Sequence, residues 1–151
     1  MSLQEIKIFL KQKLSSKIDA VELTSLIGML IEAVTGWNRM QQIVNVNTEL
    51  TKEQQALLEN YAQQLLGDKP IQYILGKAWF MGNELMVNEH VLIPRPETEE
   101  LVEWIISYAS IMNKPLSIID IGTGSGCIPI ALKLALPNCT LPSSRVYGLN
   151  G

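Results

Sequence analysis

The stretch SIIDIGTGSGCIPIALKLAL, residues 117–136, constrains the fold more than any other part of the sequence. It begins as an apolar run that predicts a buried strand and ends as a pattern that predicts a helix. Three glycines, Gly122, Gly124 and Gly126, lie between these two segments. A strand, a glycine turn and a helix N-terminus together direct backbone N–H groups towards a ligand. The stretch therefore predicts an α/β unit whose glycine loop is either a ligand site or only a tight turn from strand to helix.

The spacing of the glycines disfavours two common classes of nucleotide site. A dinucleotide-binding loop needs G-x-G-x-x-G, but its third position is Cys127, and Gly126 comes one residue too early. A P-loop needs a Gly-Lys-Ser/Thr sequence, which does not follow. A nicotinamide-dependent oxidoreductase is therefore a disfavoured interpretation.

Residues 1–69 have the apolar spacing of short amphipathic helices and predict a small helical bundle. One helix is expected between Asp19 and Gly36 and another between Thr51 and Gly67, because a capping pattern precedes each apolar stripe and a glycine follows it. A further turn of helix is expected over Arg39–Val44. By itself the bundle indicates no chemistry.

Residues 70–92 predict a β-hairpin linker that turns at Gly82-Asn83, with Trp79 and Phe80 in its core rather than on a stacking platform. Residues 93–151 predict the first part of a doubly wound domain, with a helix that begins near Pro96 and the strand and glycine loop that follow. A second parallel strand is expected at 146–149.

Composition excludes several other functions. A net charge of −3 and a pI near 5.2 argue against a general nucleic-acid binder and against binding to an anionic membrane surface. No apolar run approaches the roughly 18 residues of a membrane span, and the N-terminus does not predict a signal peptide. We expect Cys127 and Cys139 to be reduced thiols, and the single histidine, His90, to be structural or solvent-facing rather than catalytic.

Two quoted segments carry a family resemblance. The loop DIGTGSG is similar to the first motif of class I S-adenosylmethionine-dependent methyltransferases. The segment PIQYILGKAWFMGNELMVNEHVLIPRPETEELVEW precedes it, and the two together closely resemble the protein-(glutamine-N5) methyltransferase family that modifies peptide chain release factors. The resemblance implies a helical docking bundle, a β-hairpin and a Rossmann-like cofactor domain. It also implies a cytoplasmic enzyme whose substrate is the glutamine of the release factor's Gly-Gly-Gln loop.

The resemblance assigns roles to particular residues. The glycine loop, Gly122, Thr123, Gly124, Ser125 and Gly126, would hold S-adenosylmethionine. Asp120 would orient the loop or hold the amino end of the cofactor, or else it only caps the loop by accepting backbone hydrogen bonds. Arg95 and Glu97 would lie beside the cofactor pocket, or else they are a surface pair that caps the following helix.

The sequence also departs from this family. The family holds the substrate amide with an Asn-Pro-Pro-aromatic segment, but no proline of this chain follows an asparagine. Leu141–Arg145 looks like an insertion before the second strand, and Asn150 stands where the family has a ribose-binding acid, so it is expected to be a weaker ligand. We therefore expect a truncated chain without catalytic residues, inactive by itself. The alternative is a non-catalytic helical docking module with an α/β remnant.

Overall fold

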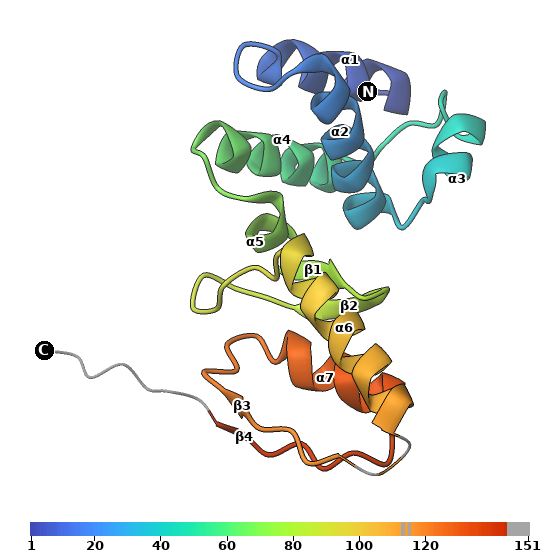
Figure 1. Cartoon of the computed structure of the whole chain (residues 1–151). Helices are drawn as coiled ribbons and strands as arrows, with labels where there is room; N and C mark the ends of the chain where they lie inside the picture. The colour runs from blue at the N-terminus through green and yellow to red at the C-terminus, as the bar shows by residue number, and fades with distance from the viewer. Residues whose placement is uncertain (113, 115, 145–151) are drawn as a thin grey trace, which may run out of the picture. The chain divides into compact units, whose positions relative to one another are not determined.

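The computed structural model describes residues 1–112, 114 and 116–144 and has two compact units, one covering Met1–Leu75 and the other beginning at Gly76 (Figure 1). The first unit contains α1 (Leu3–Leu14), α2 (Ala20–Thr35), α3 (Arg39–Val44), α4 (Lys52–Leu66) and α5 (Ile71–Leu75). The second contains β1 (Lys77–Phe80), β2 (Asn83–Met86), α6 (Pro96–Met112), β3 (Asp120–Ile121), α7 (Cys127–Ala135) and β4 (Ser143–Ser144).

The expected helix boundaries of the first unit are confirmed. The Asp19 side chain caps α2 by accepting a hydrogen bond from the backbone N–H of Val21 at 2.7 Å, and Gly36 ends this helix with a φ of 74°. Thr51 and Gln54 form a capping box at the start of α4. These boundaries were predictable because capping depends on a few neighbouring residues and not on the rest of the fold.

One apolar core holds the first unit together. Helices α1, α2 and α4 pack against one another, and α5 packs against α2 and α4. Completely buried leucines and isoleucines from the three long helices form its centre: Leu3, Leu10, Leu14, Leu30, Ile31 and Leu58. Ile71 and Ile74 of α5 join this core. Residues 71–75 are therefore helical, although the sequence placed them in the hairpin linker, because their apolar side chains complete the bundle.

Gln42 is the buried polar side chain among the described residues, and it connects α3 to α2. Its Nε2 donates to the backbone carbonyls of Gly28 and Trp37, each at 3.0 Å. A buried amide is expensive unless it is hydrogen-bonded, so these two bonds fix where α3 lies on α2.

Replacing Gln42 by leucine should lower the free energy of unfolding of the first unit by about 1–3 kcal/mol, because the part-buried carbonyls of Gly28 and Trp37 lose this donor. Denaturant titration followed by circular dichroism would measure this change. Gln63→Leu is the matched control, since Gln63 is exposed on α4 and its replacement should change stability by no more than about 0.5 kcal/mol. Equal effects of the two variants would contradict the role given to Gln42.

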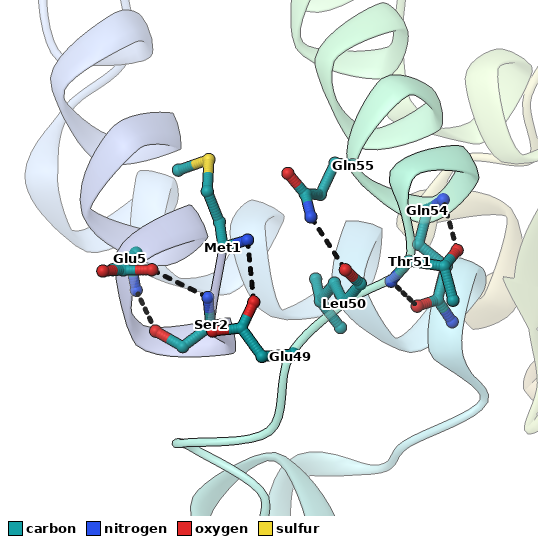
Figure 2. Close-up of polar contacts among 8 residues, drawn as sticks. All are labelled: Met1, Ser2, Glu5, Glu49, Leu50, Thr51, Gln54 and Gln55. Atoms are coloured by element: carbon teal, nitrogen blue, oxygen red, sulfur yellow. Dashed lines mark hydrogen bonds and ion pairs between the residues drawn. The ribbon is translucent and has the colours of Figure 1, made fainter.

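Surface polar contacts order the starts of α1 and α4 (Figure 2). The Ser2 N–H donates to Glu5 Oε2 at 2.8 Å, and the Met1 ammonium pairs with Glu49 Oε2 at 3.0 Å. Gln55 Nε2 donates to the carbonyl of Leu50 at 2.7 Å. The Ser2 backbone N–H, and after it the Ser2 hydroxyl, lowers the pKa of the Glu5 carboxyl. This cap therefore stabilises the fold above the ordinary glutamate pKa and loses its effect as the pH falls through the lowered value.

The hairpin of the second unit turns one residue earlier than predicted. Phe80 pairs with Asn83, so the two loop residues are Met81 and Gly82, with φ values of 48° and 73°. Two positive φ values are typical of a type I′ turn, which usually places asparagine before glycine. Because methionine occupies that position here, the sequence did not indicate this turn and indicated Gly82-Asn83 instead.

The prediction for the hairpin aromatics is half right. Phe80 is buried in a core with Val102 of α6 and Leu132 of α7, whereas the side chain of Trp79 is 63% exposed. Successive strand residues point to opposite faces, so the two neighbours could not both enter one core.

The second parallel strand, β4, lies earlier in the chain than the strand that we expected. β3 pairs with β4 in parallel, and Ser117 forms an isolated parallel bridge to Thr140 in the same register. The carbonyl of Pro142 accepts the Asp120 N–H at 3.2 Å, so the segment interpreted as an insertion contributes to the ladder. The strand expected at 146–149 lies outside the described residues.

Candidate functional site

The glycine loop joins β3 to α7 in a conformation that favours glycine. Gly122, Gly124 and Gly126 have φ values of 78°, 54° and 79°, a region that other residues rarely adopt. A Cβ atom at Gly122 would meet no heavy atom within 4 Å, and one at Gly124 would meet only the Gly122 carbonyl oxygen, at 3.8 Å. Both glycines therefore border open space, which leaves room for a ligand against the backbone.

The third glycine has a different role. Gly126 is the N-cap of α7, and its N–H donates to the Thr123 carbonyl at 2.8 Å, which closes the turn. A Cβ atom at this position would lie 3.4 Å from Cδ1 of Ile130. Gly126 therefore shapes the turn into the helix, and Pro129 fits the first turn of α7 because backbone N–H groups there lack an intrahelical partner.

Two buried side-chain oxygens at the loop lack hydrogen-bond partners among the described residues: Asp120 Oδ2 and Thr123 Oγ1. A carboxylate oxygen only accepts hydrogen bonds, whereas a threonine hydroxyl both donates and accepts. Leaving such groups unpaired is unfavourable, and a ligand with an ammonium or hydroxyl group would satisfy them. The interpretation of Asp120 as only a loop cap does not account for this free oxygen.

A hollow of about 800 Å³ opens beside the loop. Thr123–Gly126 form one wall, Pro129, Ile130 and Lys133 of α7 form another, and residues 139–141 form the third. Lys133 Nζ donates to the carbonyls of Pro137 and Cys139 at 2.8 and 3.0 Å, which ties the end of α7 to the segment leading to β4. The loop is thus reachable from solvent. The ammonium group of Lys133 is already bonded to the two carbonyls that follow α7.

The hollow is not lined by three other residues singled out in the sequence, Arg95, Glu97 and His90. Arg95 and Glu97 are exposed at the start of α6, where the Arg95 carbonyl accepts the Thr98 N–H at 3.0 Å. His90 is exposed, and its backbone N–H donates to Asn88 Oδ1 at 3.0 Å. Asn150 lies outside the described residues. The described part of the chain contains no group of three histidine, cysteine or carboxylate side chains that could hold a metal ion.

Glu99 has a structural role that sequence reasoning missed. Its Oε1 accepts the backbone N–H of Met81 at 2.7 Å, which joins the first turn of α6 to the hairpin turn. This hydrogen bond stabilises the turn in which Met81 has a positive φ. The sequence signal was the acidic cluster after Pro96, which was interpreted only as complementing the helix dipole.

No helix among the described residues is long and apolar enough to cross a membrane.

The chain is similar to known proteins in both units. A family model described as the PrmC N-terminal domain matches residues 3–76. Release factor glutamine methyltransferase of Enterococcus faecalis is 47% identical over 103 residues, which cover 68% of this chain and 36% of that protein. The proteins of the same name from Flavobacterium psychrophilum and Chlorobaculum tepidum are 45% and 37% identical, and each match covers 86% of this chain.

The matched regions cover 46% of the Flavobacterium protein and 45% of the Chlorobaculum protein, so the chain spans less than half the length of these relatives. The match extends beyond the bundle, since 86% of the chain must include part of the second unit. The chain therefore belongs to the release factor glutamine methyltransferase family.

Proposed function

We propose that the whole protein transfers a methyl group from S-adenosylmethionine to the glutamine amide of a release factor's Gly-Gly-Gln loop. In this proposal the first unit docks the release factor, and the second contributes the glycine loop of a Rossmann-like cofactor domain. The names of the relatives support the activity class, and the glycine loop with its two unpaired buried oxygens carries the assignment of the cofactor.

The residues present fit this cofactor. The backbone at Gly122 and Gly124 would lie against its methionine portion, because both glycines leave open space. Asp120 would accept hydrogen bonds from its ammonium group, and Thr123 would bond to its carboxylate or ammonium. When bound, the cofactor supplies an electrophilic methyl group on a sulfonium.

Methyl transfer to an amide also needs a group that holds the acceptor nitrogen. The amide lone pair is delocalised into the carbonyl, so catalysis depends on orienting the NH₂ group towards the methyl carbon. The family resemblance gives this task to an Asn-Pro-Pro-aromatic segment, and this sequence contains no Asn-Pro pair. We therefore propose that these 151 residues bind S-adenosylmethionine and dock the release factor but do not catalyse methyl transfer.

A second candidate function is protein docking without catalysis. It is supported by the core of the first unit, whose buried side chains all come from residues 3–74. A docking module would bind a release factor but would not need the glycine loop to accept a ligand.

Titrating the ¹⁵N-labelled chain with S-adenosylmethionine should shift the amide resonances of Asp120–Gly126, with a dissociation constant of about 1 mM or weaker. Binding should be weak because the loop alone contributes only part of a cofactor pocket. Thr123→Val removes the unpaired hydroxyl at nearly constant volume and should weaken binding further.

Thr98→Val on α6 is the matched control and should leave the titration unchanged, since Thr98 lies outside the loop. Shifts that spread over other segments and spare Asp120–Gly126 would contradict the proposed site. No shift at any concentration would favour the docking module.

A further inference from the structure

Helix α6 has two apolar faces, and only one of them packs within the second unit. Its inner face carries Val102, which is completely buried against Phe80 and α7. Its outer face carries four large apolar side chains that remain exposed: Leu101 (44%), Trp104 (68%), Tyr108 (49%) and Ile111 (80%). We call these four residues the outer stripe. Exposed apolar residues that form such a continuous row indicate an interaction surface.

The spacing of the outer stripe indicates the shape of its partner. Its members follow one another at intervals of three, four and three residues, which is the spacing of the seam between two packed helices. The stripe runs over eleven residues, and the ten helical rises between its ends give it a length of about 15 Å. A membrane surface is a poor alternative, because α6 has no basic residue to attract anionic lipid.

We propose that the partner is a second copy of this chain, with the two α6 helices antiparallel. The acidic residues of α6 all lie in its first half: Glu97, Glu99, Glu100 and Glu103. Lys114, which is exposed, comes just after the helix ends. An antiparallel pair places the acidic half of each helix beside Lys114 of the other copy and opposes the helix dipoles, whereas a parallel pair would bring the acidic halves together.

The antiparallel arrangement fixes which residues meet. Leu101 faces Ile111 of the second copy, and Trp104 faces Tyr108, so two aromatic pairs form the centre of the seam. Ser107 flanks the seam one residue from its midpoint at Ile106, so the Ser107 residues of the two copies lie only about 3 Å apart along the helix axes. Ser110, one turn away on the helix, points away from the seam. The apolar contact is short, so the dimer should be weak and should depend on protein concentration.

Sedimentation equilibrium tests the surface. As the concentration rises to several hundred micromolar, the apparent mass should increase from 16.8 kDa towards twice this value. Trp104→Glu should leave the chain monomeric over the same range, because it places a carboxylate in the seam. Trp79→Glu is the matched control, since Trp79 is exposed to a similar degree on β1 and should leave association unchanged. A chain that stays monomeric throughout, or equal effects of the two variants, would overturn the proposal.

Disulfide cross-linking tests the orientation. Ser107→Cys should form a covalent dimer under mild oxidation, whereas Ser110→Cys should form several-fold less. The two serines are well matched, because both are exposed on α6 and each hydroxyl donates to the carbonyl four residues earlier. The natural cysteines, Cys127 and Cys139, are buried and should contribute little background. Equal cross-linking at these two positions would contradict the position of the seam, and cross-linking between two Leu101→Cys chains would contradict the antiparallel orientation, in which Leu101 faces Ile111.

Discussion

A chimaera that continues residues 1–139 with the remainder of the Flavobacterium psychrophilum relative should methylate a release factor, whereas the 151-residue chain should transfer no methyl group. The chimaera would regain the segment that the family resemblance assigns to holding the amide. Without that segment the nitrogen is neither held nor aimed, and positioning supplies a large part of the acceleration in such a transfer. Transfer of tritium from labelled S-adenosylmethionine to the release factor measures both chains.

Within the chimaera, Gly124→Val should reduce methyl transfer by at least about a hundredfold. The residue has a φ of 54°, and a branched side chain would both strain this backbone and fill the space over the loop. Gly82→Val is the control: it imposes similar strain at a φ of 73° in the hairpin turn, and no heavy atom lies within 4 Å of its Cβ position. It should lower stability but leave the folded enzyme active.

The outcomes of this experiment separate the proposals. A chimaera that folds and binds the cofactor but modifies no release factor would contradict the proposed substrate. Activity of the 151-residue chain alone would contradict the proposal that the amide-holding segment is required. Equal loss of activity in the two glycine variants, measured on folded protein, would mean that backbone strain and not ligand approach explains the effect.

The sequence predicted those parts of the fold that depend on neighbouring residues. The starts of α2 and α4 follow from Asp19 and Thr51, because a capping side chain bonds to N–H groups two or three residues away. The glycine loop was predictable for a similar reason: three closely spaced glycines after an apolar strand permit the positive φ values that the structure has. Local chemistry decides these features, so a short stretch of sequence contains the necessary information.

Features that depend on distant contacts were missed. Residues 71–75 look like a linker in the sequence, and they become helical because Ile71 and Ile74 enter a core built by α2 and α4. Trp79 was expected inside, but the register of the hairpin gives the inner position to Phe80. The parallel pairing at Ser143–Ser144 was missed because neither serine has the β-branched or aromatic side chain that indicates a strand.

The candidate site shows the same division. The loop residues and Asp120 could be identified from the motif, but the free oxygens of Asp120 and Thr123 are visible only in the structure. The bond from the Met81 N–H to Glu99 joins residues eighteen positions apart, and no local pattern indicates it. The sequence therefore indicated the candidate site, and the structure shows that Asp120 Oδ2 and Thr123 Oγ1 have no hydrogen-bond partner among the described residues.

Leu58→Ala should remove most of the stability of the first unit. Leu58 is completely buried in the core shared by α1, α2 and α4, where truncation loses apolar burial and leaves a cavity. Such changes cost about 3–5 kcal/mol, of the same order as the whole stability of a small bundle. For a unit of this size, each kcal/mol lowers the melting temperature by about 4–8 °C, so we expect a shift of at least about 12 °C.

The neighbouring residue provides the control. Leu57 belongs to the same helix but is 38% exposed, so Leu57→Ala removes the same atoms with much less burial and should shift the transition by only a few degrees. Hydrogen exchange of the α2 and α4 amides assigns the effect to the first unit, and protection should fall at least about a hundredfold in Leu58→Ala. Protection that falls equally in the two variants would mean that Leu58 is not at the centre of this core. If the amides of α6 and α7 keep their protection in Leu58→Ala, the bundle unfolds separately from the second unit, as a unit with its own core should.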